Sequence, residues 1–339
     1  MTALVVVDAD TLGRQRTGDE RYVSNLLREL ASPAAAAGLR IAAVTRHPEL
    51  VPAGIEALEL RTPVQELRML WALPRLLRRV GASLAHTQYA VPFRCPCPAV
   101  VTIHDLSFER EPSLMPLKDR VVFRRVVPRA AKRAERILTV SERTKRDLVE
   151  LYAIAPSKVV VTPNGVDAAF APGNGRSPGG YVLAVGAVQA RKNQLAAVDA
   201  AAAVGLPLVV VGPIRDESLA AELRGRGADV RGYVTQDELA ELYRGAACLV
   251  QPSRFEGFGL PVLEAMASGT PVAMIDEPAL REVAGDAAVV VAEHELAEGL
   301  RQALADRDRL RAAGLERARE FSWRVTAERT LEVYVRALG

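Results

Sequence analysis

Two glutamates, Glu256 and Glu264, bracket a short glycine-containing stretch in the second half of the chain. The apolar run Ala247–Val250 precedes them and is typical of a buried parallel strand. The segment Pro261–Ser268 predicts a helix, because proline suits its first position and good helix formers follow. The pattern is therefore strand, glycine loop and helix N-terminus. Backbone N–H groups and the positive end of such a helix can bind an anion such as a diphosphate.

The two carboxylates need partners other than the anion itself, since a phosphate would repel them. Hydroxyl groups on either side of a diphosphate would serve, with a ribose at one glutamate and a sugar at the other. The pattern therefore favours a sugar nucleotide as ligand. The alternative is an ordinary helix start with two solvated glutamates, and the agreement of the glycines, the proline and both acids speaks against it.

A second candidate anion site lies at Gly186, directly after the first strand-like run of the second half, Tyr181–Val185. Arg191 and Lys192 come shortly after this glycine and precede a predicted helix. Arginine can bind a diphosphate through two parallel hydrogen bonds, and lysine can bind it as a point charge. The alternative is a solvated loop with two surface cations. The presence of another candidate phosphate loop in the same half favours the binding site.

His104 and Asp105 directly follow the predicted strand Ala99–Ile103, so they lie at a carboxyl edge of the first half. A histidine near neutrality can donate to a substrate hydroxyl, and an aspartate can orient it. A satisfied structural pair is the alternative. Gly18, in the segment Arg14–Arg21, lies between the first strand and the first helix. It either allows close approach of a substrate or belongs to a plain helix start with acids in the first turn.

Strands and helices alternate along both halves, which predicts an α/β chain with parallel sheets and helices on both faces. Residues 166–180 are rich in Pro, Gly, Ser and Asn and predict an interdomain linker. We therefore expect two Rossmann-like, doubly wound domains, residues 1–165 and residues 181–324. Within the first, the helical stretch Val64–Val80 is expected to be interrupted at Pro74. The helix Lys118–Glu135 has a candidate break at Pro128.

Composition excludes several classes of protein. Hydrophobic residues make up 49% of the 339 residues, which supports full cores. No apolar run approaches the ~20 residues of a membrane-spanning helix, and the first residues lack the features of a signal peptide, so we expect a cytoplasmic protein. A net charge of +3 does not predict nucleic acid as a partner. The three cysteines and four histidines show no metal-ligand spacing, and no bound metal is expected.

The segment Leu117–Arg136 is strongly basic and amphipathic, with only Asp119 and Glu135 as acids. Such a helix can bind anionic lipid, whereas the alternative is a solvated helix face. The basic stretch Arg75–Arg79 adds modest weight to contact with a membrane surface.

With these residues in view, the chain resembles the retaining GT-B glycosyltransferases of family GT4, in particular their bacterial mannosyltransferase-like branch. The match extends over nearly the whole chain and is strongest at residues 181–272. Glu256 and Glu264 match the paired-glutamate motif E-x7-E. The resemblance implies that Glu256 contacts hydroxyls of the donor sugar and Glu264 the ribose.

The resemblance also assigns roles to other positions, and several of them depart from the usual pattern. It implies main-chain amide contacts to the donor from Gly257, Phe258, Gly259 and Leu260. Arg191 and Lys192 match the cationic pair, although Ala187 stands where many relatives carry an arginine. Gly232-Tyr233-Val234 matches the segment that borders the nucleobase, and His104 matches the histidine near the C6 hydroxyl of the sugar. Thr17-Gly18 stands in place of a frequent double glycine. Residues 325–339 would form a helix that packs back on the first domain.

The function implied is retaining transfer of a hexose from a nucleoside diphosphate sugar to a hydroxyl of a glycan, lipid-linked or small-molecule acceptor. GDP-mannose is the preferred donor and a UDP-hexose the next. No cofactor is expected, and Arg191, Lys192 and the helix end would stabilise the diphosphate without a metal. One alternative is a GT-B sugar-nucleotide epimerase, which would turn over the donor without an acceptor. The other is a non-catalytic protein that binds a nucleotide sugar; NAD is disfavoured, since G-x-G-x-x-G follows the first strand of neither half.

Overall fold

The computed structural model describes residues 2–14, 17–62, 64–115, 117–173 and 179–339. The chain divides into two compact units. The first comprises Met1–Gly165 together with Trp323–Gly339, and the second comprises Val166–Ser322. The last helix is therefore part of the first unit, and residues 174–178 of the expected linker lie outside the described residues.

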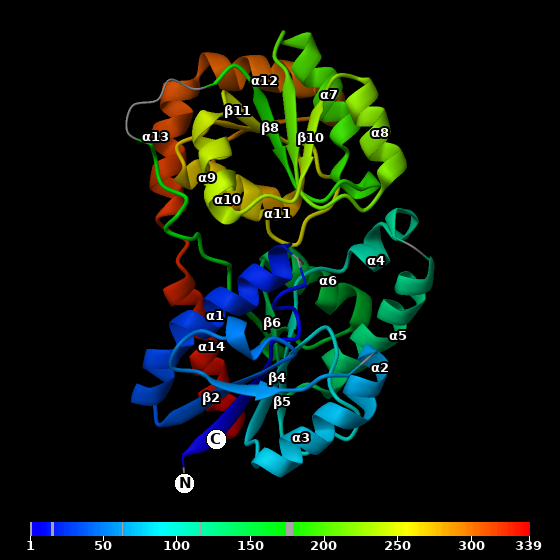
Figure 1. The fold of residues 1–339 in the computed structure, drawn as a ribbon, viewed down its shortest axis with the longest axis vertical. Coiled ribbons are helices and arrows are strands. Elements are labelled where there is room, and N and C mark those ends of the chain that lie inside the picture. The colour runs from blue at the N-terminus through cyan, green and yellow to red at the C-terminus, as the bar shows by residue number, and fades with distance from the viewer. Residues whose placement is uncertain (1, 15–16, 63, 116, 174–178) are drawn as a thin grey trace. The chain divides into compact units, whose positions relative to one another are not determined.

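The first unit is built on a seven-stranded sheet in the order β3-β2-β1-β4-β5-β6-β7 (Figure 1). Every described strand pairing in it is parallel. The strands are β1 (Ala3–Asp8), β2 (Leu39–Thr45), β3 (Glu56–Glu59), β4 (Leu84–Gln88), β5 (Ala99–Ile103), β6 (Arg136–Thr139) and β7 (Val159–Val161). The strand β3 was not predicted, because it is an edge strand that carries two glutamates, has no buried residue and so lacks an apolar signal.

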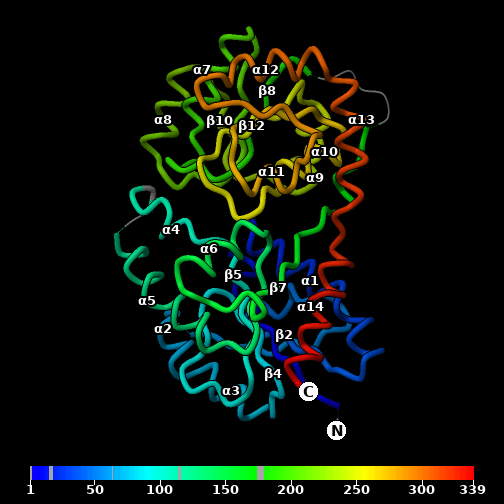
Figure 2. Tube along the Cα trace, turned by 180° about the vertical axis from the view of Figure 1, so that it is seen from behind, coloured from blue at the N-terminus to red at the C-terminus, as the bar shows by residue number. Residues whose placement is uncertain are grey.

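Helices cover both faces of this sheet. On one face lie α1 (Thr17–Ala36) and α14 (Trp323–Leu338), because Tyr22 and Tyr334 reach the strand residues Thr102 and His86. The opposite face is covered by α3, α5 and α6, which pack on Ala85, Val101 and their neighbours. Figure 2 shows α14 and α1 from behind. The remaining bounds are α3 (Leu73–Val80), α4 (Ser107–Arg110), α5 (Leu117–Arg133) and α6 (Glu142–Tyr152), with short 3-10 turns at Pro48–Leu50, Pro112–Leu114 and Pro156–Lys158.

Two expected helix breaks at proline are wrong. Residues 65–80 form one continuous helical stretch of α2 (Gln65–Leu67), the π-helical segment η2 (Arg68–Ala72) and α3. Pro74 occupies one of the first two positions of α3, and the irregular π-helical turn comes immediately before it. Pro128 lies inside α5, which continues to Arg133.

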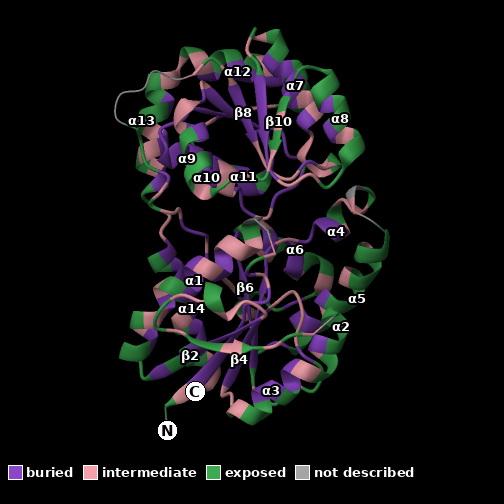
Figure 3. Cartoon of the chain, in the orientation of Figure 1, coloured by how far each residue is buried: buried purple, intermediate pink, exposed green. Residues whose placement is uncertain are grey.

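The second unit contains a six-stranded parallel sheet in the order β10-β9-β8-β11-β12-β13. Counted from β8 as the first strand, this order is 3-2-1-4-5-6, that of a doubly wound nucleotide-binding fold. The strands are β8 (Val182–Val185), β9 (Leu208–Val211), β10 (Asp229–Gly232), β11 (Cys248–Gln251), β12 (Val272–Ile275) and β13 (Val289–Val291). The inner strands are buried along their length, as Figure 3 shows, which explains their near-continuous apolar sequence.

The helices of the second unit also lie on two faces. One core joins Val182, Val210 and Ala273 to α7 (Gln194–Ala203), α8 (Glu217–Gly225) and α12 (Leu296–Ala305). The other helices are α9 (Gln236–Gly245), α10 (Leu260–Ala267), α11 (Pro278–Ala284) and α13 (Arg307–Ala318), and α10 packs against each of the other three. Short turns lie at Ala190–Lys192 (η5) and Glu293–Glu295. A capping box begins α9, in which Thr235 and Glu238 exchange hydrogen bonds.

Among the helices of the described residues, none combines the length and the hydropathy that crossing a membrane requires.

Candidate active site

The loop after β11 leads into α10 and builds the predicted strand, loop and helix start. Gly259 occupies the position before the helix with φ +118°, a conformation that favours glycine. A Cβ there would also lie 2.7 Å from a methyl carbon of Leu280. Pro261 lies in the first turn of α10, where its missing N–H costs no helical hydrogen bond. The helix begins and ends one residue earlier than predicted, at Leu260 and Ala267.

Glu256 is a buried carboxylate surrounded by hydrogen-bond donors. Its Oε1 accepts from Lys192 Nζ at 2.5 Å and from Gln251 Nε2 at 2.9 Å, and its Oε2 lies 3.5 Å from Arg191 Nη1. Burial by itself raises the pKa of Glu256. The charges of Lys192 and Arg191 lower the pKa by more than burial raises it, so the pKa of Glu256 lies below the ordinary value. The carboxylate is therefore ionised at neutral pH.

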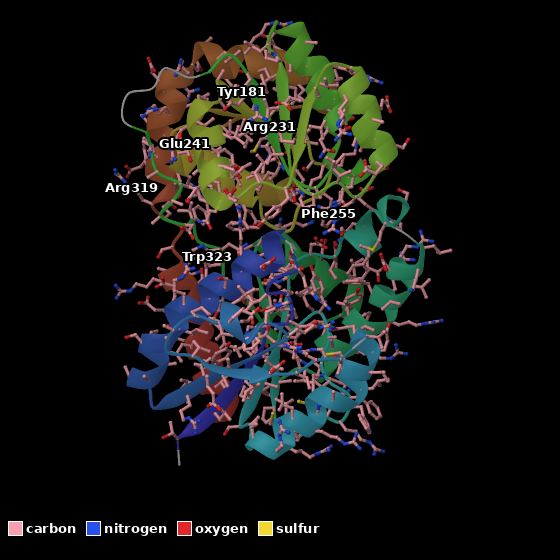
Figure 4. The ribbon with its side chains drawn as sticks, viewed as in Figure 1. Tyr181, Arg231, Glu241, Phe255, Arg319 and Trp323 are labelled. Carbon is pink, nitrogen blue, oxygen red and sulfur yellow. The ribbon has the colours of Figure 1, made fainter. Side chains whose placement is uncertain are left out.

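The two cations reach Glu256 from a different strand end. They lie in the 3-10 turn η5, which follows β8, and Arg191 also donates to the backbone oxygen of Phe255 at 2.5 Å. Gly186 has φ +147°, and a Cβ there would lie 3.2 Å from Lys192 Cε, so glycine leaves the lysine room to pass. Figure 4 marks Phe255 in the loop after β11. The two loops predicted as separate candidate anion sites therefore meet at Glu256.

Glu264 lies inside α10 and is 2% exposed. Its Oε2 accepts a hydrogen bond of 2.9 Å from the hydroxyl of Tyr243, a fully buried residue of α9. Tyr243 and Gln251 were not predicted from the sequence as partners of the glutamates. Tyr243 follows the apolar spacing of α9 and so carried only the signal of a core residue.

The other residues predicted to contact the donor differ in how far their side chains are buried. Phe258 is buried with its ring 5.8 Å from that of Phe321, so only its main chain can face a ligand. Gly257 and Leu260 are half-buried beside it. Tyr233 is exposed and Val234 half-buried, directly after the end of β10.

In the first unit, His104 directly follows β5 and is buried between aromatic rings. The ring centroid of Tyr22 lies 4.8 Å away, edge-on, and that of Tyr89 lies 5.7 Å away. His104 Nε2 is 2.9 Å from Gln88 Oε1 and 4.0 Å from Asp19 Oδ1. Burial lowers the pKa of His104 although Asp19 and Asp105 oppose the shift. The imidazole is therefore neutral at pH 7 and can exchange hydrogen bonds with a hydroxyl.

Asp105 and Gly18 have local structural roles in the same unit. Asp105 Oδ1 accepts from the backbone N–H and the hydroxyl of Ser107, at 3.1 and 2.9 Å, and so fixes the turn into α4. Gly18 lies in the first turn of α1, and a Cβ added there would meet no atom within 4 Å. The start of α1, with Asp19 and Glu20 in its first turn, fits the plain helix start, and residues 15–16 of this loop lie outside the described residues.

Sequence comparison places these sites in a known family. Residues 165–321 match the family described as Glycosyl transferases group 1, and residues 16–170 match Glycosyltransferase Family 4. The chain is 31% identical over 269 residues to O-antigen chain mannosyltransferase B of Escherichia coli, with 70% of each chain covered. The chain belongs to glycosyltransferase family 4. It is an enzyme of the glycosyltransferase class.

Other relatives and solved structures agree with this family 4 assignment. O-antigen chain mannosyltransferase RfbU of Salmonella typhimurium is 28% identical over 311 residues, covering 85% of this chain and 86% of its own. A D-inositol 3-phosphate glycosyltransferase of Kineococcus radiotolerans is 34% identical over 251 residues, covering 60% of this chain and 58% of its own. Sucrose-phosphate synthase from Thermosynechococcus elongatus superposes with a TM-score of 0.78, 20% identity and 98% of each chain covered.

The fold of this family 4 enzyme is GT-B, as predicted. A further solved structure, the glycosyltransferase WaaG involved in lipopolysaccharide biosynthesis, has a TM-score of 0.73 at 18% identity, with 97% of this chain and 99% of WaaG covered. At such identities the likeness concerns the fold alone. The sheets of seven and six parallel strands are the two Rossmann-like domains of that fold.

Proposed function

We propose that the protein is a retaining glycosyltransferase that moves a hexose from a nucleoside diphosphate sugar to an acceptor hydroxyl. The observation that carries this proposal is the group formed by Glu256, Lys192 and Arg191 in the loops after β8 and β11. It combines two cations for a diphosphate with an ionised carboxylate for sugar hydroxyls. The first turn of α10 follows the same loop and adds the positive end of a helix.

The donor would replace one set of ionic contacts with another. Without donor, Glu256 neutralises part of the charge of Lys192 and Arg191. A diphosphate bound to the two cations would carry more negative charge than one carboxylate, which frees Glu256 to accept hydrogen bonds from the sugar. Gln251 contacts Glu256 from the buried side and would keep it in place during the exchange.

Glu264 and its neighbours complete the proposed donor site. Glu264, held by Tyr243, would accept hydrogen bonds from the ribose. Main-chain groups of Gly257, Phe258, Gly259 and Leu260 would contact the sugar and the diphosphate, with Gly186 giving space. Tyr233 and Val234 would border the base.

The leaving diphosphate would be stabilised by Lys192, Arg191 and the N-terminus of α10, which makes the reaction independent of a metal. The acceptor hydroxyl would attack from the face on which the phosphate departs, and a phosphate oxygen would accept its proton. His104 would donate to or accept from a sugar hydroxyl, with Asp105 fixing the turn beside it and Gly18 near the substrates.

Mannose is the sugar that we propose is transferred. The printed names of the Escherichia coli, Salmonella typhimurium and Mycolicibacterium hassiacum relatives are those of mannosyltransferases. GDP-mannose would then be the donor, with a UDP-hexose second. The acceptor would be a glycan, a lipid-linked molecule or a small molecule, met in the cytoplasm or at the inner face of a membrane through the basic helix α5.

A thermal-shift panel with GDP, UDP, ADP and their sugars tests this proposal. A ligand that binds only the folded protein at 100 times its Kd adds about 2.7 kcal/mol of stability, so the correct nucleotide should raise Tm well above the others. No shift with any nucleotide would contradict the proposal. Release of an epimerised sugar nucleotide in the absence of acceptor would favour an epimerase instead.

A further inference from the structure

Exposed apolar side chains gather on one part of the first unit, away from the residues discussed above. Trp71 is 62% exposed, and Leu67 and Leu70 beside it in α2 and η2 are more than half exposed. Phe93, in the loop after β4, is also half exposed. Single exposed apolar residues are common on proteins, whereas a group that includes a tryptophan and a phenylalanine marks an interaction site.

The backbone holds these side chains outward in a fixed arrangement. Arg68, which begins η2, is completely buried and donates to Asp8 Oδ1 and to the backbone oxygens of Val44 and Leu60. The π-helical turn is therefore anchored to the sheet by its first residue, so that Leu70 and Trp71 lie on its outer side. The N–H of Phe93 donates to the backbone oxygen of Met69 at 2.9 Å, which joins the loop to the turn.

Cations are placed directly on these rings. The guanidinium carbon of Arg75 lies 3.3 Å from the centroid of the Trp71 ring, and that of Arg94 lies 5.5 Å from the centroid of the Phe93 ring. Arg78 and Arg79 are exposed on α3. The surface therefore combines aromatic rings, aliphatic side chains and positive charge.

The same combination continues onto α5. This helix covers the same face of the sheet as α3, and Arg133 at its end donates to the backbone oxygen of Pro92, next to Phe93, at 3.4 Å. Val122, Val126 and Arg129 are exposed at intervals of three or four residues along α5 and lead towards Arg133. Residues with this spacing share one side of a helix.

We propose that the Trp71 surface, formed by Leu67, Leu70, Trp71, Arg75, Phe93 and Arg94, docks onto an anionic lipid bilayer. Tryptophan and phenylalanine bury their rings at the boundary between headgroups and acyl chains, and arginines beside them pair with anionic headgroups. The cationic side of α5 widens the attraction to the same membrane. The Trp71 surface would supply the apolar part of the proposed membrane contact. The proposed lipid-linked acceptor would explain why the enzyme binds a membrane, but the binding itself is inferred from the Trp71 surface alone.

The test is co-sedimentation of the full chain with vesicles of phosphatidylglycerol and phosphatidylcholine, compared with phosphatidylcholine alone. The protein should bind the anionic vesicles and be released by high salt. The chain has two tryptophans, and the other, Trp323 at the start of α14, is buried (Figure 4). The difference in fluorescence emission between the wild type and Trp71→Ser therefore reports the emission of Trp71. This emission should shift to shorter wavelength when anionic vesicles are added.

Matched variants separate the Trp71 surface from general surface effects. Trp71→Ser should lower the partition onto anionic vesicles about tenfold or more, the loss expected for one large buried apolar side chain. Val335→Ser, at an exposed apolar position of α14 on the opposite face of the sheet, should leave it unchanged. Arg75→Glu should lower partition by about fivefold or more, the effect of one cation near an anionic surface. Arg329→Glu, exposed on α14, should have a smaller effect.

Three results would overturn the inference. These are equal binding to neutral vesicles, unchanged partition of Trp71→Ser, and a dimer in sedimentation velocity that Trp71→Ser dissolves. The last result would assign the Trp71 surface to a second copy of the chain. Nucleotide-induced thermal shifts should be the same in the wild type and in Trp71→Ser, so failure of vesicle binding would not be confused with failure of the proposed donor site.

Discussion

The carboxyl edges of the two sheets carry different kinds of side chain. In the second unit, the loops after β8 and β11 bring an ionised glutamate against two cations, all three largely buried. In the first unit, the end of β5 carries His104, which burial keeps neutral between two tyrosine rings. Charged groups suit a diphosphate and its departure, whereas a neutral imidazole suits a hydroxyl. Two sheets of the same class thus support different contacts because their loops differ.

The largest effect is expected for Glu256→Gln, which keeps the shape of the side chain but removes its charge. Transfer should fall by about 100-fold or more, the usual loss when one group that contacts a transition state is removed. Binding of the nucleoside diphosphate should stay the same or tighten, because Lys192 and Arg191 lose a competing anion. Steady-state kinetics and a binding titration measure both. Wild-type turnover would refute the role of Glu256.

Glu264→Ala should weaken binding of the nucleotide by about 1–3 kcal/mol, the cost of a lost hydrogen bond to a charged group. Tyr243→Phe removes only the hydroxyl that holds the carboxylate and should have a smaller effect on the same titration. Unchanged affinity in Glu264→Ala would exclude contact with the ribose.

The neutral histidines of the first unit predict how its stability depends on pH. Burial lowers the pKa of His86 to about 3 and also lowers that of His104. Both folded values lie below the unfolded value of about 6.5, so the unfolded chain binds the proton first as pH falls. The contribution of the two histidines to the free energy of unfolding is therefore fully present above pH ~6.5. Below that pH, the free energy of unfolding should fall by up to about 1.4 kcal/mol per pH unit for each histidine. Chemical denaturation between pH 7.5 and 5 measures this, and a flat profile would contradict the burial of the neutral forms.

His104→Ala should raise the activation free energy that kcat/KM reports by roughly 0.5–1.5 kcal/mol, because one neutral hydrogen bond to a hydroxyl is lost. His104→Gln, which can still donate, should recover part of it. A loss as large as that of Glu256→Gln would show that the two edges do not differ in the way described.

The smallest expected effect is that of EDTA. In the proposed donor site, Lys192, Arg191 and the start of α10 would supply the positive charge for the diphosphate, so treatment with EDTA should leave transfer unchanged. Restoration of lost activity by Mg²⁺ or Mn²⁺ would show that these groups are insufficient.

Much of the fold could be predicted because its signals are local. The strand β11, the glycine before α10, the proline in its first turn and the capping box of α9 each rest on neighbouring residues. The failures also have local causes. The edge strand β3 has no apolar pattern, and Pro74 predicts a break although the helical stretch continues through it, with a π-helical segment directly before α3.

The α/β alternation, the family resemblance and the paired-glutamate motif follow from residue type and spacing along the chain, so they could be predicted from the sequence. The contacts of Lys192 and Arg191 with Glu256, the hydrogen bond from Tyr243 to Glu264 and the position of Phe93 beside the turn of Trp71 became known only from the folded structure. Each of these pairs joins elements that are separated along the chain. Their meeting depends on strand order and helix packing, which no local pattern encodes.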